Sequence, residues 1–138
     1  MQHFQIVMAL VRQGNGYVLQ LRNGKNQSGG LNLIGCFGGQ IEPGETPEQA
    51  LVRELAEESN VHSKVTDLQY FGEVRVDSER HDQPITVHSR IYRLELPESV
   101  KIEAQEGQLI RMTTQEVRAN LDKLTPATKA CFEQLIKE

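Results

Sequence analysis

Apolar residues occur along this chain in short runs that predict a succession of β-strands. The run FQIVMALV at residues 4–11 is rich in side chains that favour a strand. A turn sequence at residues 13–16 separates it from YVLQLR at residues 17–22, so these two runs predict a β-hairpin. Further strands are predicted around residues 31–37, 67–76, 85–96 and 109–112. The charged residues 77–84 between two of them predict a loop.

One helix has clear beginning and end sequences. Thr46 is a good N-cap, Pro47 suits the first helical position, and Gln49 completes a Thr-x-x-Gln capping box. The helix is predicted from Pro47 to about Ser59, with Asn60 as a left-handed C-cap residue.

Two shorter helices are predicted near the end of the chain, one capped by Thr113 and one from Pro126 to Lys137. Strands, a helix, more strands and final helices in this order predict a mixed α/β fold in layers. The length of 138 residues suits one domain over residues 1–138.

Composition and charge narrow the class of protein. No run approaches the roughly 18 apolar residues that span a bilayer, and the first apolar stretch is broken at Arg12, which argues against a signal peptide. We therefore expect a cytoplasmic protein without a membrane partner. The net charge of −4 argues against a nucleic-acid partner. An anionic ligand would need a local basic patch or a bound cation.

The predicted helix carries three acidic residues on one face, Glu54, Glu57 and Glu58, hereafter the three helix glutamates. At 100° per residue they fall within an arc of roughly 100°, on the side away from Val52 and Ala56. Taken alone, such a cluster is typical of a solvated face. Like charges at this spacing repel by roughly 0.2–0.5 kcal/mol per pair, however, and a Mg²⁺ ion would relieve the repulsion.

The surrounding segment at residues 38–61 reads GGQIEPGETPEQALVRELAEESNV. It resembles the Nudix box: a glycine, five residues, Glu, seven residues, then Arg-Glu-aliphatic-x-Glu-Glu-x-Gly-aliphatic. The positions that fit are Gly39, Glu45, Arg53, Glu54, Leu55, Glu57, Glu58 and Val61. Asn60 alone departs, where the family has glycine, and Asn is the next-best residue for a left-handed cap.

This resemblance implies a Nudix-type α/β/α sandwich with a mixed sheet and the Nudix loop and helix. It also implies Mg²⁺-dependent hydrolysis, with Mn²⁺ as a substitute, of a phosphoanhydride in a nucleoside diphosphate derivative. The wording GETPEQ and VREL is closest to the MutT branch, which favours a (deoxy)nucleoside triphosphate split into monophosphate and pyrophosphate. The alternatives are a nucleoside diphosphate-sugar or dinucleotide pyrophosphatase, a non-catalytic ligand-sensing domain, and an isomerase. The oligomeric state, including a homodimer, stays open.

The resemblance also assigns roles to residues of the box. The three helix glutamates and the backbone carbonyl of Gly39 are the implied metal ligands. Either Glu54 or Glu57 could instead accept the proton of the attacking water. Arg53 is expected to pair with Glu45 and to orient the ligands, rather than to bind phosphate.

Outside the box, four charged residues are candidates for the same site. The resemblance places Arg22 and Lys25 near substrate phosphates, although both are also typical of solubilising surface charges. Glu106 is the expected downstream carboxylate because Gly107 allows its loop to bend, whereas Glu103 is expected to contribute little. A surface acid is the alternative for Glu106.

Overall fold

The computed structural model describes residues 2–22 and 32–137. Its strands are β1 (Gln2–Gln13), β2 (Gly16–Leu21), β3 (Ile34–Gly35), β4 (Phe37–Gln40), β5 (Gln69–Arg80), β6 (Gln83–Leu96) and β7 (Gln108–Met112). Its helices are α1 (Pro47–Glu58), α2 (Thr114–Ala119) and α3 (Pro126–Gln134), with short 3₁₀ turns at Val65–Asp67 and Leu121–Lys123. In this part of the chain no helix is long and apolar enough to cross a membrane.

The strands form one mixed sheet, as predicted. Among the described residues it has seven strands in the order β3-β2-β1-β6-β5, with β4 pairing with β1 and β7 with β2. The long central pair, β1 and β6, is parallel along its whole length, and β5 and β6 are antiparallel. The predicted hairpin of β1 and β2 is present, with Val11 opposite Val18.

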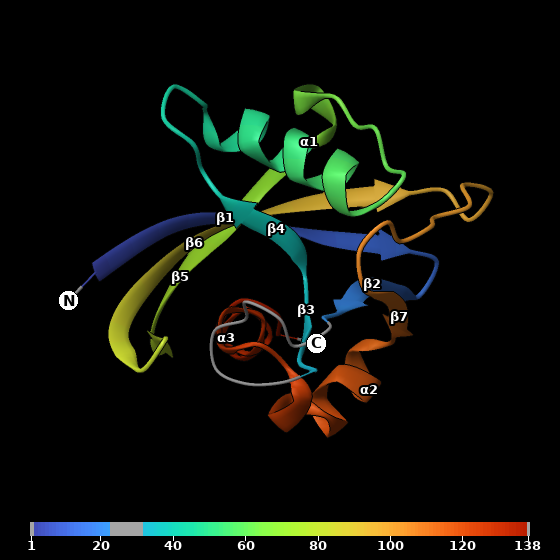
Figure 1. The fold of residues 1–138 in the computed structure, drawn as a ribbon. Coiled ribbons are helices and arrows are strands. Elements are labelled where there is room, and N and C mark those ends of the chain that lie inside the picture. The colour runs from blue at the N-terminus through green and yellow to red at the C-terminus, as the bar shows by residue number, and fades with distance from the viewer. Residues whose placement is uncertain (1, 23–31, 138) are drawn as a thin grey trace.

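Strand β1 is covered on both faces, which explains its nearly continuous apolar run. Val7 and Ala9 belong to a core cluster that contains Leu55 of α1. Met8 alternates with them and belongs to a second cluster that contains Phe132 of α3, because successive strand residues point to opposite faces. Figure 1 shows α1 on one side of the sheet and α2 and α3 on the other. The predicted α/β/α sandwich is therefore confirmed.

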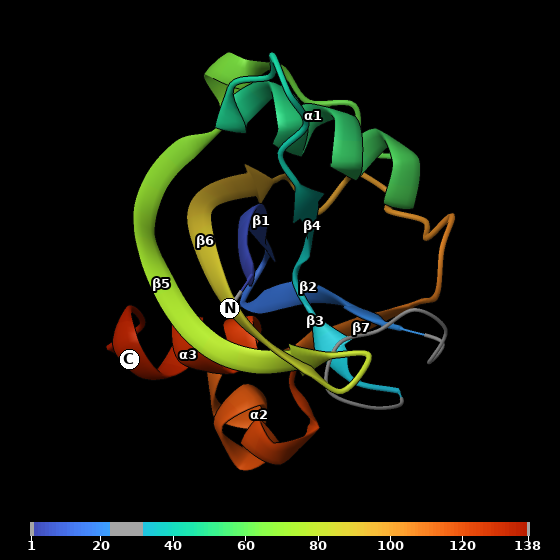
Figure 2. The ribbon, with the colours of Figure 1, turned by 60° about the vertical axis from the view of Figure 1, so that its left-hand side comes forward.

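The loop predicted at residues 77–84 is wrong. Strands β5 and β6 extend through it as a hairpin, with Arg80 opposite Gln83. His81 and Asp82 form the two-residue turn, with φ of 51° and 63°, which suits the twist of a hairpin. The charged residues misled the prediction because this end of the hairpin is largely exposed. Figure 2 shows how strongly both strands curve.

Helix α1 begins as predicted, because the Thr46 side chain and Gln49 form the complete capping box. The left-handed cap at Asn60 is wrong: the C-cap is Ser59 in extended backbone, and Asn60 is not among the residues with positive φ. The Asn60 side chain instead donates to the Lys101 carbonyl (2.9 Å) and accepts from the Glu103 N–H (2.8 Å). It bridges the helix end to a distant loop.

Candidate active site

The three helix glutamates lie on α1 where this helix packs against β4, and their surroundings differ sharply. Glu57 is exposed over 53% of its side chain, and Glu54 over 15%. Glu58 is only 4% exposed, and its Oε1 accepts a hydrogen bond from the Gly38 backbone N–H at 2.9 Å. The acidic face is therefore not the solvated surface that such a cluster usually forms.

Burial changes the acidity of two of these carboxyls. It raises the pKa of Glu58 to about 8, although the charge of Arg22 and the Gly38 N–H oppose this change. Burial also raises the pKa of Glu54, against the opposing hydrogen bond from Arg53. The Glu106 carboxylate raises the pKa of both glutamates, which places its charge within reach of the site.

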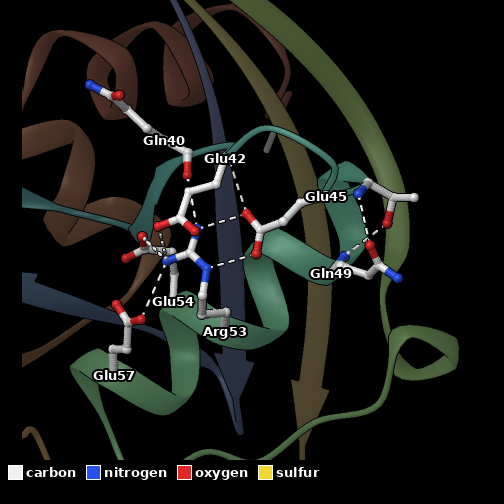
Figure 3. A network of polar contacts seen from close by, with 8 residues as sticks. Gln40, Glu42, Glu45, Gln49, Arg53, Glu54 and Glu57 are labelled. Carbon is white, nitrogen blue, oxygen red and sulfur yellow. Dashed lines mark hydrogen bonds and ion pairs between the residues drawn. The ribbon is translucent and has the colours of Figure 1, made fainter.

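Arg53 is the centre of an ion-pair network that Figure 3 shows from close by. Its Nε donates to Glu45 Oε2 at 2.7 Å and its Nη2 to Glu45 Oε1 at 2.9 Å, a two-pronged contact. Its Nη1 donates to Glu54 at 2.8 Å and to Glu57 at 3.4 Å, and its Nη2 reaches the Gln40 carbonyl at 3.1 Å. The hydrogen bonds from Arg53 lower the pKa of Glu45 to about 2. The expected pair of Arg53 and Glu45 is thus present and joins the loop to the helix.

The glycines of β4 allow the strand to approach its neighbours closely. A Cβ on Gly39 would lie 2.5 Å from the Glu54 carboxyl, and a Cβ on Gly38 would lie 2.0 Å from the Val7 carbonyl oxygen. Any side chain at either position would therefore displace the strand or the carboxylate. This close approach puts the Gly39 backbone, an expected metal ligand, beside Glu54.

The loop between β6 and β7, which carries Glu106 and which we call the downstream loop, is hydrogen-bonded to the end of α1. The Glu58 carbonyl accepts hydrogen bonds from the Gln105 N–H (2.9 Å) and from the Glu106 N–H (3.3 Å). Gln20 Nε2 donates to the Glu106 carbonyl at 2.8 Å, although Gln20 lies in β2 and is only 2% exposed. Gln20 was not predicted as a residue of the site. Its one indication in the sequence is a polar side chain inside an otherwise apolar strand.

A cavity of about 230 Å³ lies on the other side of β4, and we call it the trough. Its lining includes Phe4, Met8, Arg22, Gly39, Arg80 and Ala127. Arg22 also donates to the Cys36 carbonyl at 3.4 Å. Lys25 lies outside the described residues. Sequence patterns gave no indication of the trough, because its walls come from strands and a helix that are far apart in the chain.

A family model described as the NUDIX domain matches residues 2–135. This chain belongs to the NUDIX family. The predicted membership of the Nudix family and the predicted fold are confirmed.

Similar proteins agree with this assignment. The 8-oxo-dGTP diphosphatase of Escherichia coli K12 is 39% identical over 61 residues, which are 44% of this chain and 46% of that protein, so the match spans about half of the relative's length. The MutT protein of Methanosarcina mazei Go1 has a TM-score of 0.77 at 15% identity and covers 97% of this chain and 93% of its own. The E. coli ORF135 protein has a TM-score of 0.67 at 26% identity, over 96% and 88%.

The Nudix residues are not arranged as a ready metal site. Within the part of the chain that the structure describes, no three His, Cys, Asp or Glu side chains converge on one point. Arg53 engages Glu54 and Glu57, while Glu58 turns toward Gly38. The donors still suit Mg²⁺, because they are carboxylate and carbonyl oxygens. A cation would also offset the burial that raises the pKa of Glu58 and Glu54.

Proposed function

We propose that this Nudix chain hydrolyses a phosphoanhydride bond in a nucleoside diphosphate derivative, with Mg²⁺ or Mn²⁺ as cofactor. The best-supported substrate is a (deoxy)nucleoside triphosphate, cleaved to monophosphate and pyrophosphate. One observation carries the proposal: Gly38 and Gly39 separate the trough from the buried carboxylate of Glu58 and the partly buried carboxylate of Glu54. A nucleotide in the trough would present its phosphates to those carboxylates across β4.

The three helix glutamates and the Gly39 carbonyl are the residues that would hold the cation. When bound, Mg²⁺ screens phosphate charge and makes a coordinated water more acidic. Arg53 Nη1 engages only Oε1 of Glu54 and Oε1 of Glu57, so the second oxygen of each carboxylate stays available to the ion. The other contacts of Arg53, to Glu45 and to the Gln40 carbonyl, fix the position of the loop relative to the helix.

Two further residues act on the phosphates and the water in this proposal. Arg22 lines the trough, and its charge lowers the pKa of Glu58. Its guanidinium can therefore pair with a phosphate that lies between the trough and Glu58. Glu106 approaches from the downstream loop and can hold or deprotonate the attacking water. Four expectations from the sequence stay predictions. They are a phosphate contact by Lys25, a single Nudix domain over residues 1–138, a cytoplasmic location and a homodimer.

The partial similarity to the E. coli 8-oxo-dGTP diphosphatase favours a triphosphate substrate. It includes less than half of either chain, so it supports the choice of substrate without deciding it. A nucleoside diphosphate-sugar or dinucleotide substrate is the alternative from the sequence, and a product analysis separates the two.

The test is a panel of nucleoside triphosphates, diphosphate-sugars and dinucleotides with Mg²⁺, with each product identified by chromatography. We expect monophosphate and pyrophosphate from a triphosphate, and loss of turnover in excess EDTA. Glu57→Gln should abolish most turnover, whereas Glu133→Gln, an exposed acid on α3, should not. Orthophosphate as the first product, turnover of diphosphate-sugars alone, or full activity in EDTA would overturn the proposal.

A further inference from the structure

Arg80 and Phe4 form one contact at the end of the trough away from the box glycines. The Arg80 guanidinium carbon lies 5.1 Å from the centroid of the Phe4 ring, in a cation–π arrangement. Both residues line the trough. They are 76 positions apart in the chain, and the β5–β6 hairpin that was predicted to be a loop carries Arg80 to this place.

The strand register gives the length of the trough. Phe4, Ile6 and Met8 alternate along one face of β1, and Met8 is the partner of Gly38 in β4. Met8 is four positions along the strand from Phe4, which corresponds to about 13 Å. A phosphate placed at β4 and a base placed beside Arg80 at the Phe4 end therefore have room for a sugar between them.

Most hydroxyl groups of the lining are already engaged within the protein. Thr128 Oγ1 accepts from the Cys36 N–H at 3.0 Å and lies 2.9 Å from Thr125 Oγ1. Arg80 differs from them: in the described residues its guanidinium makes the contact with Phe4 and no hydrogen bond or ion pair. Its N–H groups therefore remain available to a ligand that enters the trough.

We propose that Arg80, held over Phe4, recognises the base of the substrate and selects one with carbonyl acceptors on its edge, such as guanine, over adenine. Arginine pairs through two hydrogen bonds with the O6 and N7 acceptors of guanine, whereas adenine presents an amino donor at that edge and suits Asn or Gln. The Phe4 ring holds the Arg80 guanidinium in place through the cation–π contact. This inference rests on the proposed nucleotide substrate.

The chain contains a matched control for this pair. Arg93 lies over the Phe71 ring at 4.5 Å, also on the β5–β6 hairpin, but neither residue lines the trough. Replacement of either arginine by Gln removes one cation–π contact, so general effects on stability should be similar. A change in base preference should occur in Arg80→Gln alone.

The experiment measures the Kd of GMP and of AMP with Mg²⁺ by calorimetry, and kcat/KM for dGTP and dATP. Wild type should prefer the guanine nucleotide by on the order of 10-fold to 100-fold, and Arg80→Gln should remove or reverse that ratio. Arg93→Gln should keep the wild-type ratio. Phe4→Leu should reduce the wild-type ratio, because it removes the ring that holds Arg80 in place. Circular dichroism melts establish that each variant folds, and Arg80→Lys, which keeps the charge without the planar fork, provides a second variant.

The possible results separate this inference from the proposed function. If dGTP and dATP are both hydrolysed with a ratio that Arg80→Gln and Arg80→Lys leave unchanged, the role of Arg80 is refuted while the proposed function stands. A wild type that prefers adenine also refutes it. If no nucleotide binds or is cleaved, both proposals fall together.

Discussion

Asn60 offers a direct test of how the end of α1 is built. As a left-handed cap, Asn60 could be replaced by Gly with no loss, and Ala would be the worse replacement because its side chain disfavours positive φ. The structure predicts the opposite order. Asn60 has no positive φ, and its side chain makes two hydrogen bonds to the backbone of the downstream loop.

The magnitude follows from those two contacts. Each hydrogen bond contributes a net ~0.5–1.5 kcal/mol, so Asn60→Ala should lower the free energy of unfolding by about 1–3 kcal/mol, nearer the lower figure because the site is partly exposed. Asn60→Gly loses the same bonds and should cost a further ~0.4–1 kcal/mol, because glycine makes the unfolded chain more flexible. Both variants should also lower kcat, since the loop carries Glu106.

Urea unfolding of the metal-free protein, followed by circular dichroism, measures both changes. Asn15→Ala and Asn15→Gly, in the exposed turn between β1 and β2, are the controls and should change stability by less than about 0.5 kcal/mol. The reasoning is refuted if Asn60→Gly is as stable as wild type and more stable than Asn60→Ala. That order is the mark of a left-handed cap.

The remaining predictions concern single carboxylates. In the metal-free folded protein the pKa of Glu58 is about 8, whereas in the unfolded chain it is about 4.5. Between these pH values the folded state holds a proton that the unfolded state has lost. The free energy of unfolding should therefore fall as the pH rises through this interval, by up to about 1.4 kcal/mol per pH unit. Glu58→Gln should flatten this slope in urea titrations at several pH values; an equal slope would contradict it. Glu106→Gln should lower kcat more than it raises KM, while Glu103→Gln should change neither constant much. If Glu103→Gln alone lowers kcat, the assignment of Glu106 as the carboxylate of this loop is wrong. Glu57→Gln should weaken Mn²⁺ binding in a direct titration. It should leave the metal-free melting temperature equal or higher, because it removes repulsion with Glu54 and loses only a long, exposed ion pair with Arg53. Unchanged Mn²⁺ affinity would exclude Glu57 as a ligand.

The elements that the sequence predicted well are those whose cause is local. Thr46, Pro47 and Gln49 determine where α1 begins, because capping involves neighbours within one turn. Helical spacing alone puts Glu54 and Glu57 on one face. The prediction was wrong for Asn60, whose side-chain partners lie in a distant segment. It was also wrong for the hairpin at residues 77–84, because exposed, charged strand residues have the composition of a loop.

The sequence by itself thus determined the family, the start of the acidic helix and the face on which its glutamates lie. Only the tertiary structure decided that Glu58 is buried against Gly38 while Glu57 stays exposed, and that Arg80 reaches Phe4. The physical reason is that helix and strand periodicity depend on residues a few positions apart. Burial, and with it the pKa of a carboxyl, depends on which distant segments pack against the side chain.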